Sequence, residues 1–411
     1  MRIAIFTETY LPDANGVATH VKTLKDGLEA LGHDVLIVTA DAACRHHVMS
    51  SGILHCPAVT SKRLYNYSVA SPLSLNRFRL IKRWKPDIIH IQNEFGTGIS
   101  GVMAASLLGI PLVYTMHTMY DNYIYYVAPR PFIPAATRAS HRYFRKIAKH
   151  CSALTGASEK IERYIRECGI KQPVSIIPNA VELDIFDPDR CNPEKTAEIR
   201  KRYGLKRTAA CFCGRLGEEK NLDTLLAYWA EASKSLDDIS LLIVGDGPHR
   251  AHLEELAKKL SISENVHFTG KIPHAELPEY YAACNLFVTA SLSENYSISM
   301  LEALASGLPV VHMLDELNEC QLVNGVNGFP FTSEQEFVTI MSSLSSMSDV
   351  ERDELSANIR MSVKNSGAKE LAEYIVDLYN KICSGKAVVG NLRHLKHFPH
   401  SKRVSVRRKR P

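Results

Sequence analysis

The sequence predicts an α/β protein of two Rossmann-like domains, each built on a parallel sheet, that face each other across a cleft. Three observations support this prediction. The chain has 411 residues, which is too long for one ordinary hydrophobic core. Short apolar runs alternate with amphipathic helical patterns in two separate series. The two series are joined by residues 178–189, a turn-rich segment with a proline near each end, which we take as the domain linker.

The first series begins with an apolar strand at residues 2–6 and a turn-rich loop. An amphipathic helix is expected at 17–31, with Gly32 as its stop signal. Further short apolar runs predict buried strands at 35–38, 87–91, 112–115, 153–156 and 174–177. Helical patterns fall at 100–108, 135–149 and 158–168. Residues 41–75 show less regular patterning.

The second series repeats the alternation. Its apolar runs predict strands at 209–213, 240–244, 265–268 and 286–290. Its helical patterns lie at 221–234, 248–260, 274–283, 296–306, 333–346 and 350–383. We therefore expect an N-terminal domain over 1–180, a C-terminal domain over 181–365, a closing helix over 366–384 that returns toward the N-terminal domain, and a basic tail over 385–411.

Composition is that of a globular protein, with 45% hydrophobic and 23% charged residues. No run approaches the roughly 20 apolar residues that span a bilayer, and Glu8 lies too early for the apolar region of a signal peptide. These features predict a cytoplasmic protein. Its ten cysteines lack metal-binding spacing, so we expect reduced thiols and no metal site. The net charge of +5 is uneven, because residues 385–411 hold nine Lys or Arg and no acid, which leaves a mildly acidic body.

The strongest chemical signal lies in residues 286–311, where a strand, a polar loop and a helix follow one another. Glu294 stands just before the helix and Glu302 two turns inside it. Eight residues of helix separate them by about 12 Å, which is too far for an acid–base pair acting on one bond. The helix N-terminus between them favours an anion. This order suits a nucleotide-sugar, which offers sugar hydroxyls, a diphosphate and ribose hydroxyls.

Two cations and a glycine stand where they could meet a diphosphate. Arg215 and Lys220 follow the strand 209–213 at its carboxyl end, directly after Gly214. Arginine and lysine both suit phosphate oxygens. A solvated surface loop is an equally weighted interpretation of these two cations. Gly16, between the first strand and its helix, would let the backbone approach a phosphate, although a purely structural turn is the commoner role for such a glycine.

Five blocks, in this order and spacing, resemble the retaining glycosyltransferases of family four, which have the GT-B architecture: PNAVELDIF (178–186), GRLGEEKN (214–221), LLIVGDGP (241–248), VHFTGKIP (266–273) and SLSENYSISMLEALASGLPVV (291–311). The resemblance covers most of residues 1–330. It implies a sugar-nucleotide donor bound mainly by the C-terminal domain, an acceptor presented by the N-terminal domain, and no obligatory metal or other cofactor.

The resemblance also implies roles for single residues. Glu294 would hold donor sugar hydroxyls, and Glu302 would hold the ribose hydroxyls. Arg215 and Lys220, which follow the strand 209–213, would hold the diphosphate. Gly214, at the same strand end, would belong to the same binding loop. Gly16 would close on the donor phosphates from the other domain, and His117 would approach the donor sugar.

The donor-binding loop of the family includes the positions of Ser297 and Ile298. Ser297 stands where the family commonly has glycine, and this departure leaves the identity of the hexose open. The resemblance implies front-face attack with retention, in which the leaving phosphate takes the acceptor proton. The absence of an evident nucleophile or carboxylate pair agrees with that expectation.

A basic stripe runs along the helix expected at 135–149. Its cations recur at helical spacing, at Arg138, Arg142, Arg145 and Lys149, and no acid occurs between Asp121 and Glu159. An apolar segment, residues 131–134, precedes the stripe and could insert into lipid. The pattern is typical of an interfacial helix on an anionic membrane, and the basic tail would add to it. A solvated basic helix packed on the sheet is the alternative, and no nucleic-acid-binding fold accompanies the charge.

Two segments, HIQNEFGTG (90–98) and YTMHTMYDNYIYY (114–126), resemble the diacylglycerol glucosyltransferases within the family. We therefore expect a membrane-associated retaining enzyme at the inner face of the plasma membrane, which moves glucose from UDP-glucose to diacylglycerol. Other acceptors remain open: phosphatidylinositol, a soluble sugar or an envelope polysaccharide. A non-catalytic partner of a sister enzyme is a further alternative, and a nucleotide-sugar epimerase is disfavoured by the spacing of the five blocks.

Overall fold

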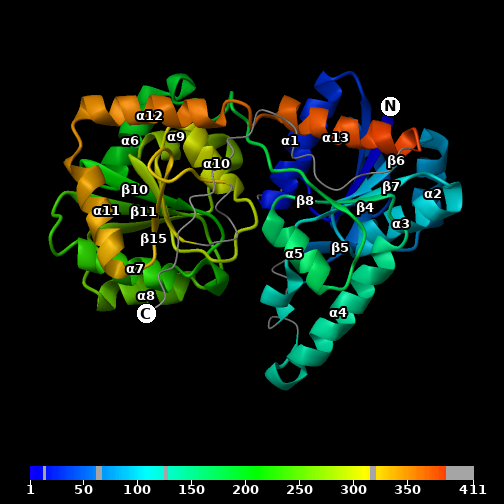
Figure 1. The fold of residues 1–411 in the computed structure, drawn as a ribbon, viewed down its shortest axis with the longest axis horizontal. Coiled ribbons are helices and arrows are strands. Elements are labelled where there is room, and N and C mark those ends of the chain that lie inside the picture. The colour runs from blue at the N-terminus through cyan, green and yellow to red at the C-terminus, as the bar shows by residue number, and fades with distance from the viewer. Residues whose placement is uncertain (13–14, 62–66, 125–127, 315–320, 386–411) are drawn as a thin grey trace, which may run out of the picture.

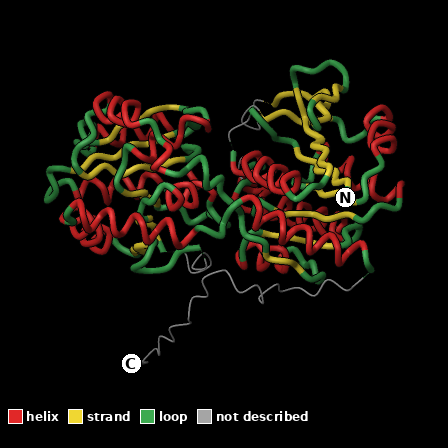
Figure 2. Tube along the Cα trace, turned by 90° about the horizontal axis from the view of Figure 1, so that it is seen from above, coloured by secondary structure: helices red, strands yellow, loops and turns green. Residues whose placement is uncertain are grey.

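The computed structural model describes residues 1–12, 15–61, 67–124, 128–314 and 321–385. These residues form two lobes that lie side by side, each with a sheet covered by helices (Figures 1 and 2). The predicted fold of two parallel-sheet domains is confirmed. The basic tail, apart from Gly385, lies outside the described residues. Among the residues described, no helix combines the length and apolar character needed to cross a membrane.

The described strands of the first lobe form a nine-stranded sheet in the order β3-β4-β2-β1-β6-β7-β8-β9, with β5 beside β4. Their bounds are β1 (Arg2–Thr7), β2 (Asp34–Asp41), β3 (Val48–Ser50), β4 (Ile53–Ser61), β5 (Tyr67–Ala70), β6 (Ile88–Ile91), β7 (Leu112–Met116), β8 (Ala153–Gly156) and β9 (Val174–Ile176). The path from β4 to β9 is parallel, whereas β3 and β5 are antiparallel to β4. Central strands buried on both faces explain the continuous apolar runs.

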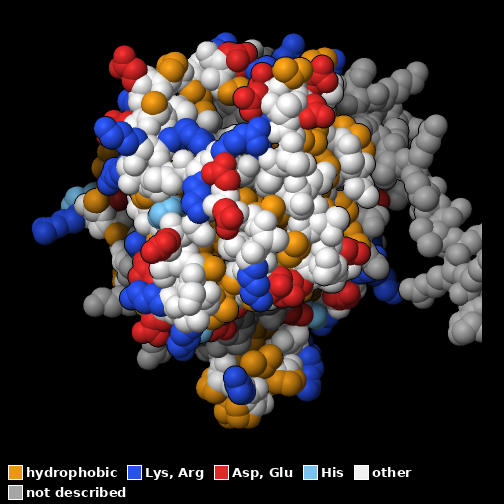
Figure 3. All heavy atoms as spheres, turned by 90° about the vertical axis from the view of Figure 1, so that its left-hand side faces the viewer, with side chains coloured by type: hydrophobic (Ala, Val, Ile, Leu, Met, Phe, Trp, Pro, Cys, Tyr) orange, Lys and Arg blue, Asp and Glu red, His pale blue; other side chains and the backbone are white. Residues whose placement is uncertain are grey.

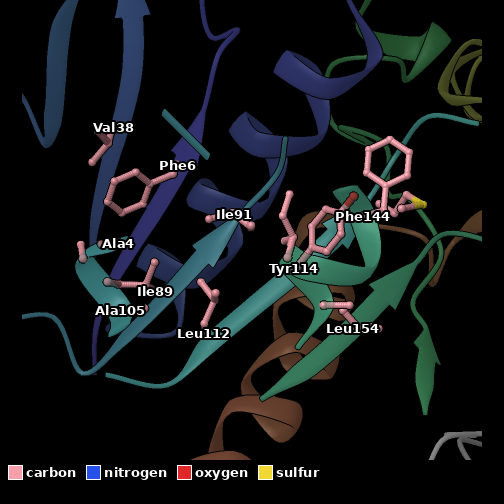
Figure 4. Packing of buried hydrophobic residues seen from close by; sticks show 14 of the residues in the cluster. Ala4, Phe6, Val38, Ile89, Ile91, Ala105, Leu112, Tyr114, Phe144 and Leu154 are labelled. Atoms are coloured by element: carbon pink, nitrogen blue, oxygen red, sulfur yellow. The ribbon is translucent and has the colours of Figure 1, made fainter. Parts of the chain in front are cut away.

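The helices of the first lobe are α1 (Gly16–Ala30), α2 (Leu75–Trp84), α3 (Gly96–Leu108), α4 (Ile133–Ala148) and α5 (Glu159–Glu167). Figure 4 shows part of the core, with side chains from the neighbouring strands β2, β1, β6, β7 and β8 and Phe144 of α4. Large apolar side chains such as Phe6 and Tyr114 are fully buried there. Each contributes about 1.5–3 kcal/mol by leaving water. The N-terminal end of α4 projects from this lobe (Figure 1).

The described strands of the second lobe form a six-stranded parallel sheet in the order β12-β11-β10-β13-β14-β15. Their bounds are β10 (Thr208–Cys213), β11 (Ile239–Val244), β12 (Val266–Gly270), β13 (Leu286–Thr289), β14 (Val310–Met313) and β15 (Gly328–Phe331). In this order β10 and β13 are neighbours at the centre. The loops that follow these two strands therefore meet at one edge of the sheet, where ligands of such folds bind.

The remaining helices are α6 (Pro193–Arg202), α7 (Leu222–Ala232), α8 (Arg250–Lys259), α9 (Leu277–Ala282), α10 (Ile298–Ala305), α11 (Glu334–Ser346), α12 (Asp349–Val363) and α13 (Ala368–Cys383). The last of these crosses back to the first lobe and packs on α1 (Figure 1), which confirms the predicted return of the chain. A Cβ atom at Gly27 of α1 would lie 2.1 Å from the carbonyl oxygen of Ala368. Only glycine permits this close approach of two helices.

The structure differs from the sequence expectations in three places. Residues 41–75 are not irregular, because they contain β3, β4 and β5. β3 is exposed, and β5 pairs antiparallel with β4. Neither strand has the continuous apolar run that marks a buried strand. The helical pattern at 350–383 is two helices, broken where the chain changes lobes. The helices α2 and α6 and the strand β15 were not predicted.

Candidate active site

The loop between β13 and α10, residues 290–297, carries Glu294 and is called the donor loop here. Lys220 lies in a short 3-10 helix, Glu218–Lys220, which follows β10. Its Nζ lies 2.5 Å from Glu294 Oε1. The two residues are 74 positions apart in sequence, and the adjacency of β10 and β13 brings them together. Both side chains are largely shielded from solvent.

Both members of this ion pair remain charged at neutral pH. Burial would raise the pKa of the Glu294 carboxyl, but the Lys220 ammonium holds that pKa below its ordinary value. Burial would lower the pKa of Lys220, but Glu294 holds that pKa above its ordinary value. A fixed, half-buried pair of charges can interact with a polar ligand without reorganising first.

Arg215 lies directly after Gly214, at the carboxyl end of β10, and its Nη2 is 2.6 Å from Oε1 of Glu219. The Gly214 N–H donates to the carbonyl oxygen of Val244 at 3.0 Å. A Cβ atom at Gly245 would lie 1.9 Å from the Gly214 carbonyl oxygen, so the loops after β10 and β11 meet backbone to backbone. This packing holds the two predicted cations, Arg215 and Lys220, beside the donor loop.

Ser297 is the N-cap of α10. Its side chain accepts a hydrogen bond from the Met300 N–H at 3.4 Å, which is the usual role of serine at the N-cap of a helix. Gln321 holds the same peptide from outside, because its Oε1 accepts from the Ser297 N–H and its Nε2 donates to the Ser297 carbonyl oxygen. The serine that departs from the family pattern thus defines where the helix begins.

Two helix N-termini meet across the lobes at this point. Gly16 is the first residue of α1 and Ile298 the first of α10. A Cβ atom at Gly16 would have the Ile298 Cδ1 atom as its nearest neighbour, at 3.9 Å. Both helix ends present backbone N–H groups and a partial positive charge. Together with Arg215 and Lys220 they form surroundings that favour a phosphate group.

Glu302 is the fifth residue of α10, about one turn inside the helix rather than the two turns expected, because α10 begins only at Ile298. Its carboxylate is held from both sides. Its Oε1 is 3.2 Å from His274 Nε2, and its Oε2 accepts from the Tyr281 hydroxyl at 2.9 Å. The other ring nitrogen of His274 is 3.7 Å from Glu182 Oε2, and Glu182 pairs with Lys22 of α1. The hydrogen bond with Glu302 raises the pKa of His274. This network connects the second carboxylate to the linker and to the first lobe.

His117 lies just after β7, on the first lobe. Its Nε2 is 2.7 Å from the Gln92 Oε1, and its ring meets His20 edge-on at 4.8 Å. Burial lowers the pKa of His117 well below its ordinary value, so its imidazole is neutral. The carbonyl oxygen of His117 accepts from the Asn295 Nδ2 at 2.6 Å, which places His117 next to the donor loop.

Sequence reasoning missed several residues that hold the donor loop from outside. Lys160 of α5 donates to two carbonyl oxygens of the loop, and Asn179 of the linker donates to the Tyr296 carbonyl oxygen at 2.7 Å. Asn179 and Asn295 lie within the quoted blocks and could have been marked as polar members of them. Lys160 and His274 had no signal of their own, since each is a single polar residue in an ordinary pattern.

The basic stripe lies on α4, with Lys149 at its C-cap. Arg138, Arg142 and Lys149 are exposed, and no described acid forms an ion pair with them. Arg145 differs, because its Nη1 donates to the Cys168 carbonyl oxygen at 2.7 Å. Arg145 therefore caps the C-terminal end of α5 and is not part of the exposed stripe.

The tip of the helix is apolar. Phe132, just before α4, is 63% exposed. Figure 3 shows a protrusion at the bottom of the molecule on which hydrophobic side chains gather, flanked by Lys and Arg. The projecting end of α4 in Figure 1 points the same way. The described residues thus combine an exposed apolar tip with an exposed cationic face.

Two groups among the described residues could hold a metal ion: Asp41, Cys44 and His55, and separately Asp223, His249 and His252. Neither group includes a predicted site residue. In the second group both imidazoles already lie within 2.7 Å of the Asp223 carboxylate oxygens. The site derived above therefore consists of side chains and helix ends, with the opposite charges of Lys220 and Glu294 near its centre.

Comparison with known proteins matches a glycosyltransferase family model to each half of the chain. Residues 14–185 match the family described as Glycosyltransferase Family 4, and residues 195–362 match the family described as Glycosyl transferases group 1. An alpha-monoglucosyldiacylglycerol synthase of Streptococcus pneumoniae is 33% identical, over 76% of this chain and 70% of its own. One of Acholeplasma laidlawii is 30% identical, over 82% and 86%. A GDP-mannose-dependent alpha-mannosyltransferase of Corynebacterium glutamicum is 28% identical, over 80% and 76%.

Solved structures share the fold at low sequence identity. Sucrose-phosphate synthase from Thermosynechococcus elongatus superposes with a TM-score of 0.72 at 18% identity, over 94% of this chain and all of that one. Anabaena Alr3699/HepE, in complex with UDP, gives 0.69 at 16% identity, over 93% of this chain and all of that one. The architecture is accordingly GT-B. Together with the two relatives of 30% identity or more, it shows that the chain belongs to the family 4 glycosyltransferases.

Proposed function

We propose that this protein is a retaining glycosyltransferase that moves glucose from UDP-glucose to a hydroxyl group of diacylglycerol at a membrane surface. Two relatives are named for a product of this kind, alpha-monoglucosyldiacylglycerol. The observation that carries the proposal is the Lys220–Glu294 pair beside two facing helix N-termini. It offers a carboxylate for sugar hydroxyls next to positive charge for a diphosphate.

The residues divide the donor between them. Glu294 accepts hydrogen bonds from sugar hydroxyls, while Arg215, Lys220 and the end of α1 at Gly16 neutralise the diphosphate. Glu302, about one turn inside α10, accepts from the ribose hydroxyls. The donor therefore lies along α10, in the order sugar, phosphates, ribose. We also propose domain boundaries near residues 180 and 365. The acceptor binds to the domain before residue 180, and the donor binds mainly to the domain between the two boundaries.

The reaction needs no protein nucleophile. Glu294 is paired with Lys220, and Glu302 is held by His274 and Tyr281, so neither carboxylate is placed as a member of a glycosidase-type pair. The acceptor hydroxyl attacks the anomeric carbon on the face that the diphosphate leaves. The carbon–phosphate-oxygen bond breaks, the new carbon–oxygen bond forms on the same face, and the acceptor proton passes to the departing phosphate. The His117 carbonyl oxygen contacts the donor loop, and the neutral imidazole of this residue is proposed to contact the sugar.

The acceptor side rests on the first lobe. A diacylglycerol molecule keeps its acyl chains in the bilayer, so the enzyme must work at the lipid surface. The apolar tip at Phe132 enters the interface, and the exposed cations Arg138, Arg142 and Lys149 meet anionic headgroups. With the basic tail, this favours the anionic cytoplasmic leaflet of the plasma membrane.

The test is a product analysis. The purified protein is incubated with UDP-glucose, UDP-galactose, UDP-N-acetylglucosamine and GDP-mannose, each with vesicles containing diacylglycerol or phosphatidylinositol or with soluble sugars. Mass spectrometry and the anomeric proton coupling of the product then give the acceptor, the hexose and the anomer. A glucosylated diacylglycerol of α configuration is expected.

A mannosylated product would favour the second candidate donor, GDP-mannose, on which a 28% identical relative depends by name. A product on phosphatidylinositol or a soluble sugar would replace the acceptor and keep the chemistry. Donor binding without any product would favour a non-catalytic partner and contradict the proposal.

A further inference from the structure

Lys160 makes an unusual connection between the two lobes. It lies in the first turn of α5, on the first lobe, and is only 6% exposed. Its Nζ donates to the Leu292 carbonyl oxygen at 2.7 Å and to the Glu294 carbonyl oxygen at 3.0 Å. Both acceptors belong to the donor loop of the second lobe. One ammonium group from the acceptor side thus holds the backbone of the residue that carries the donor-side carboxylate.

The contact is part of a set. Asn295 of the donor loop donates to the His117 carbonyl oxygen, and Asn179 of the linker donates to that of Tyr296. Of these three donors only Lys160 carries a charge. Hydrogen bonds from a charged donor are about twice as strong as those between neutral groups. We therefore expect Lys160 to contribute more than Asn295 or Asn179 to the interaction between the first lobe and the donor loop.

Because Lys160 is buried, its contact with the donor loop favours the arrangement in which the lobes are together. A buried ammonium is costly unless hydrogen-bond acceptors surround it, and here the acceptors belong to the opposite lobe. When the lobes move apart, Lys160 loses both carbonyl groups and returns to water. Burial raises the pKa of the Glu294 carboxyl, and Lys220 and Ser291 lower it; the charge of Lys160 adds a smaller lowering effect. Separation of the lobes would therefore leave the loop with only the contacts of its own lobe, such as those of Lys220 and Gln321.

We propose that Lys160 is a positioning residue that couples closure of the two lobes to the placement of Glu294 for recognition of the donor sugar. This inference rests on the proposed function, because it assumes that Glu294 contacts the sugar. The carbonyl oxygens that Lys160 binds are those of Leu292 and of Glu294 itself. Its effect is therefore expected at the sugar end of the donor, where Glu294 is proposed to bind, more than at the nucleotide end.

The proposal predicts a specific pattern for Lys160→Met, which keeps the length of the side chain and removes its charge. The affinity for UDP, measured by calorimetry, stays within about twofold of the wild type. The affinity for UDP-glucose falls, and kcat for transfer falls about a hundredfold, the size expected for loss of two charge-assisted hydrogen bonds. Lys160→Arg restores part of kcat, because a guanidinium can also donate to carbonyl groups.

Amide hydrogen exchange reports the same coupling without turnover. In Lys160→Met the amides of residues 291–297 exchange faster, while those of the central strand β10 keep their protection. Lys171→Met, an exposed lysine of the same lobe, is the matched control and leaves loop exchange and kcat unchanged. Equal losses of UDP and UDP-glucose affinity, or unchanged exchange in the donor loop, would overturn the coupling.

The proposed function can fail without deciding this inference. If the wild type transfers sugar to another acceptor or uses another donor, the Lys160 variants are measured with that pair. If no transfer occurs at all, hydrogen exchange and the ratio of the UDP and UDP-glucose affinities still test the link between Lys160 and the donor loop. A Lys160→Met variant that binds UDP-glucose like the wild type contradicts the inference even when diacylglycerol proves to be the acceptor.

Discussion

The surroundings of the donor loop and helix α4 are both rich in charge, but the protein arranges that charge in opposite ways. Around the donor loop the cations are shielded from solvent and engaged, Lys220 with Glu294, Arg215 with Glu219, and Lys160 with two carbonyl groups. On α4 the cations at Arg138 and Arg142 are exposed, and no described acid pairs with them. Fixed charges suit one ligand in one pose. Exposed, unpaired charges suit a surface of many anions, where the exact geometry matters little.

The largest expected effect is loss of the donor-loop pair. Glu294→Gln keeps the shape of the side chain but removes its charge, and Lys220→Met does the same for the partner. Each is expected to lower kcat about a thousandfold, the upper end of what one preorganised charged contact contributes to a transition state. Breaking a buried pair also destabilises the fold, by about 3–5 kcal/mol when fully buried, so the melting temperature must be measured with activity.

The control for this comparison is an exposed pair of the same second lobe. Lys234 and Glu231 are 2.5 Å apart on the surface. Glu231→Gln removes the same charge at a site that can rehydrate, and it should change neither kcat nor stability measurably. Near-normal turnover in Glu294→Gln and Lys220→Met would show that the donor loop is not the catalytic site.

The second effect tests α4. Replacing Arg138, Arg142 and Lys149 by Ser should weaken binding to anionic vesicles by about 1 kcal/mol for each cation, or roughly a hundredfold in total at low salt. Arg145 is left in place because it caps the end of α5. Sedimentation with vesicles checks the result, and calorimetry should find UDP binding unchanged.

The matched control replaces three exposed lysines of the second lobe, Lys201, Lys258 and Lys259, and so alters the net charge equally. If both triple variants bind vesicles equally well, α4 is not the membrane face. The difference between the two variants should also shrink as salt is added, since the Debye length is about 8 Å at physiological ionic strength.

The two regions also differ in how much of them the sequence could predict. The ends of the donor loop were predictable because Glu294 and Ser297 are neighbours in a compact block between a strand and a helix. The partner of Glu294 in the acceptor lobe was not, because Lys160 is 134 positions away and follows no pattern. Contacts between lobes depend on how two finished domains dock, and no local periodicity records that.

For α4 the residue pattern predicted the helix and its basic stripe but not the exception at Arg145. Helical spacing tells which residues share a face, whereas the end of α5 that Arg145 reaches is set by the packing of the sheet. Similarly, β3 and β5 were missed because edge strands expose side chains and so lack a continuous apolar run. In this protein, local patterns predict central strands and helices, and tertiary docking determines the rest.

A smaller effect is expected at the apolar tip. Phe132→Ser removes a large exposed side chain that would enter the lipid interface. Vesicle binding should weaken about tenfold, because partial burial of an aromatic ring contributes roughly 1.5 kcal/mol. Val350→Ser is the control, since Val350 is equally exposed on α12 of the second lobe. Equal vesicle binding by these two variants would leave the cations of α4 and the basic tail as the proposed lipid contacts.

The smallest effect concerns stability and pH, and it tests whether the linker network resembles the donor loop in using fixed charge. His274 lies between Glu302 and Glu182, with Lys22 beyond, and the hydrogen bond with Glu302 raises its pKa. A raised pKa in the folded state means that protonated His274 stabilises the fold below the ordinary pKa of histidine, about 6.5. That stabilisation is lost as the pH rises through the folded pKa.

His274→Gln should therefore lower the free energy of unfolding more at pH 5.5 than at pH 8.5, as measured by urea denaturation at both values. His150→Gln, at an exposed histidine of the first lobe, should show no such dependence. Because Glu302 is proposed to hold the ribose, UDP affinity of the wild type should also fall between these pH values, and in the His274 variant it should not. A pH-independent cost of His274→Gln would mean that this histidine acts by packing against Phe186 and not by its charge.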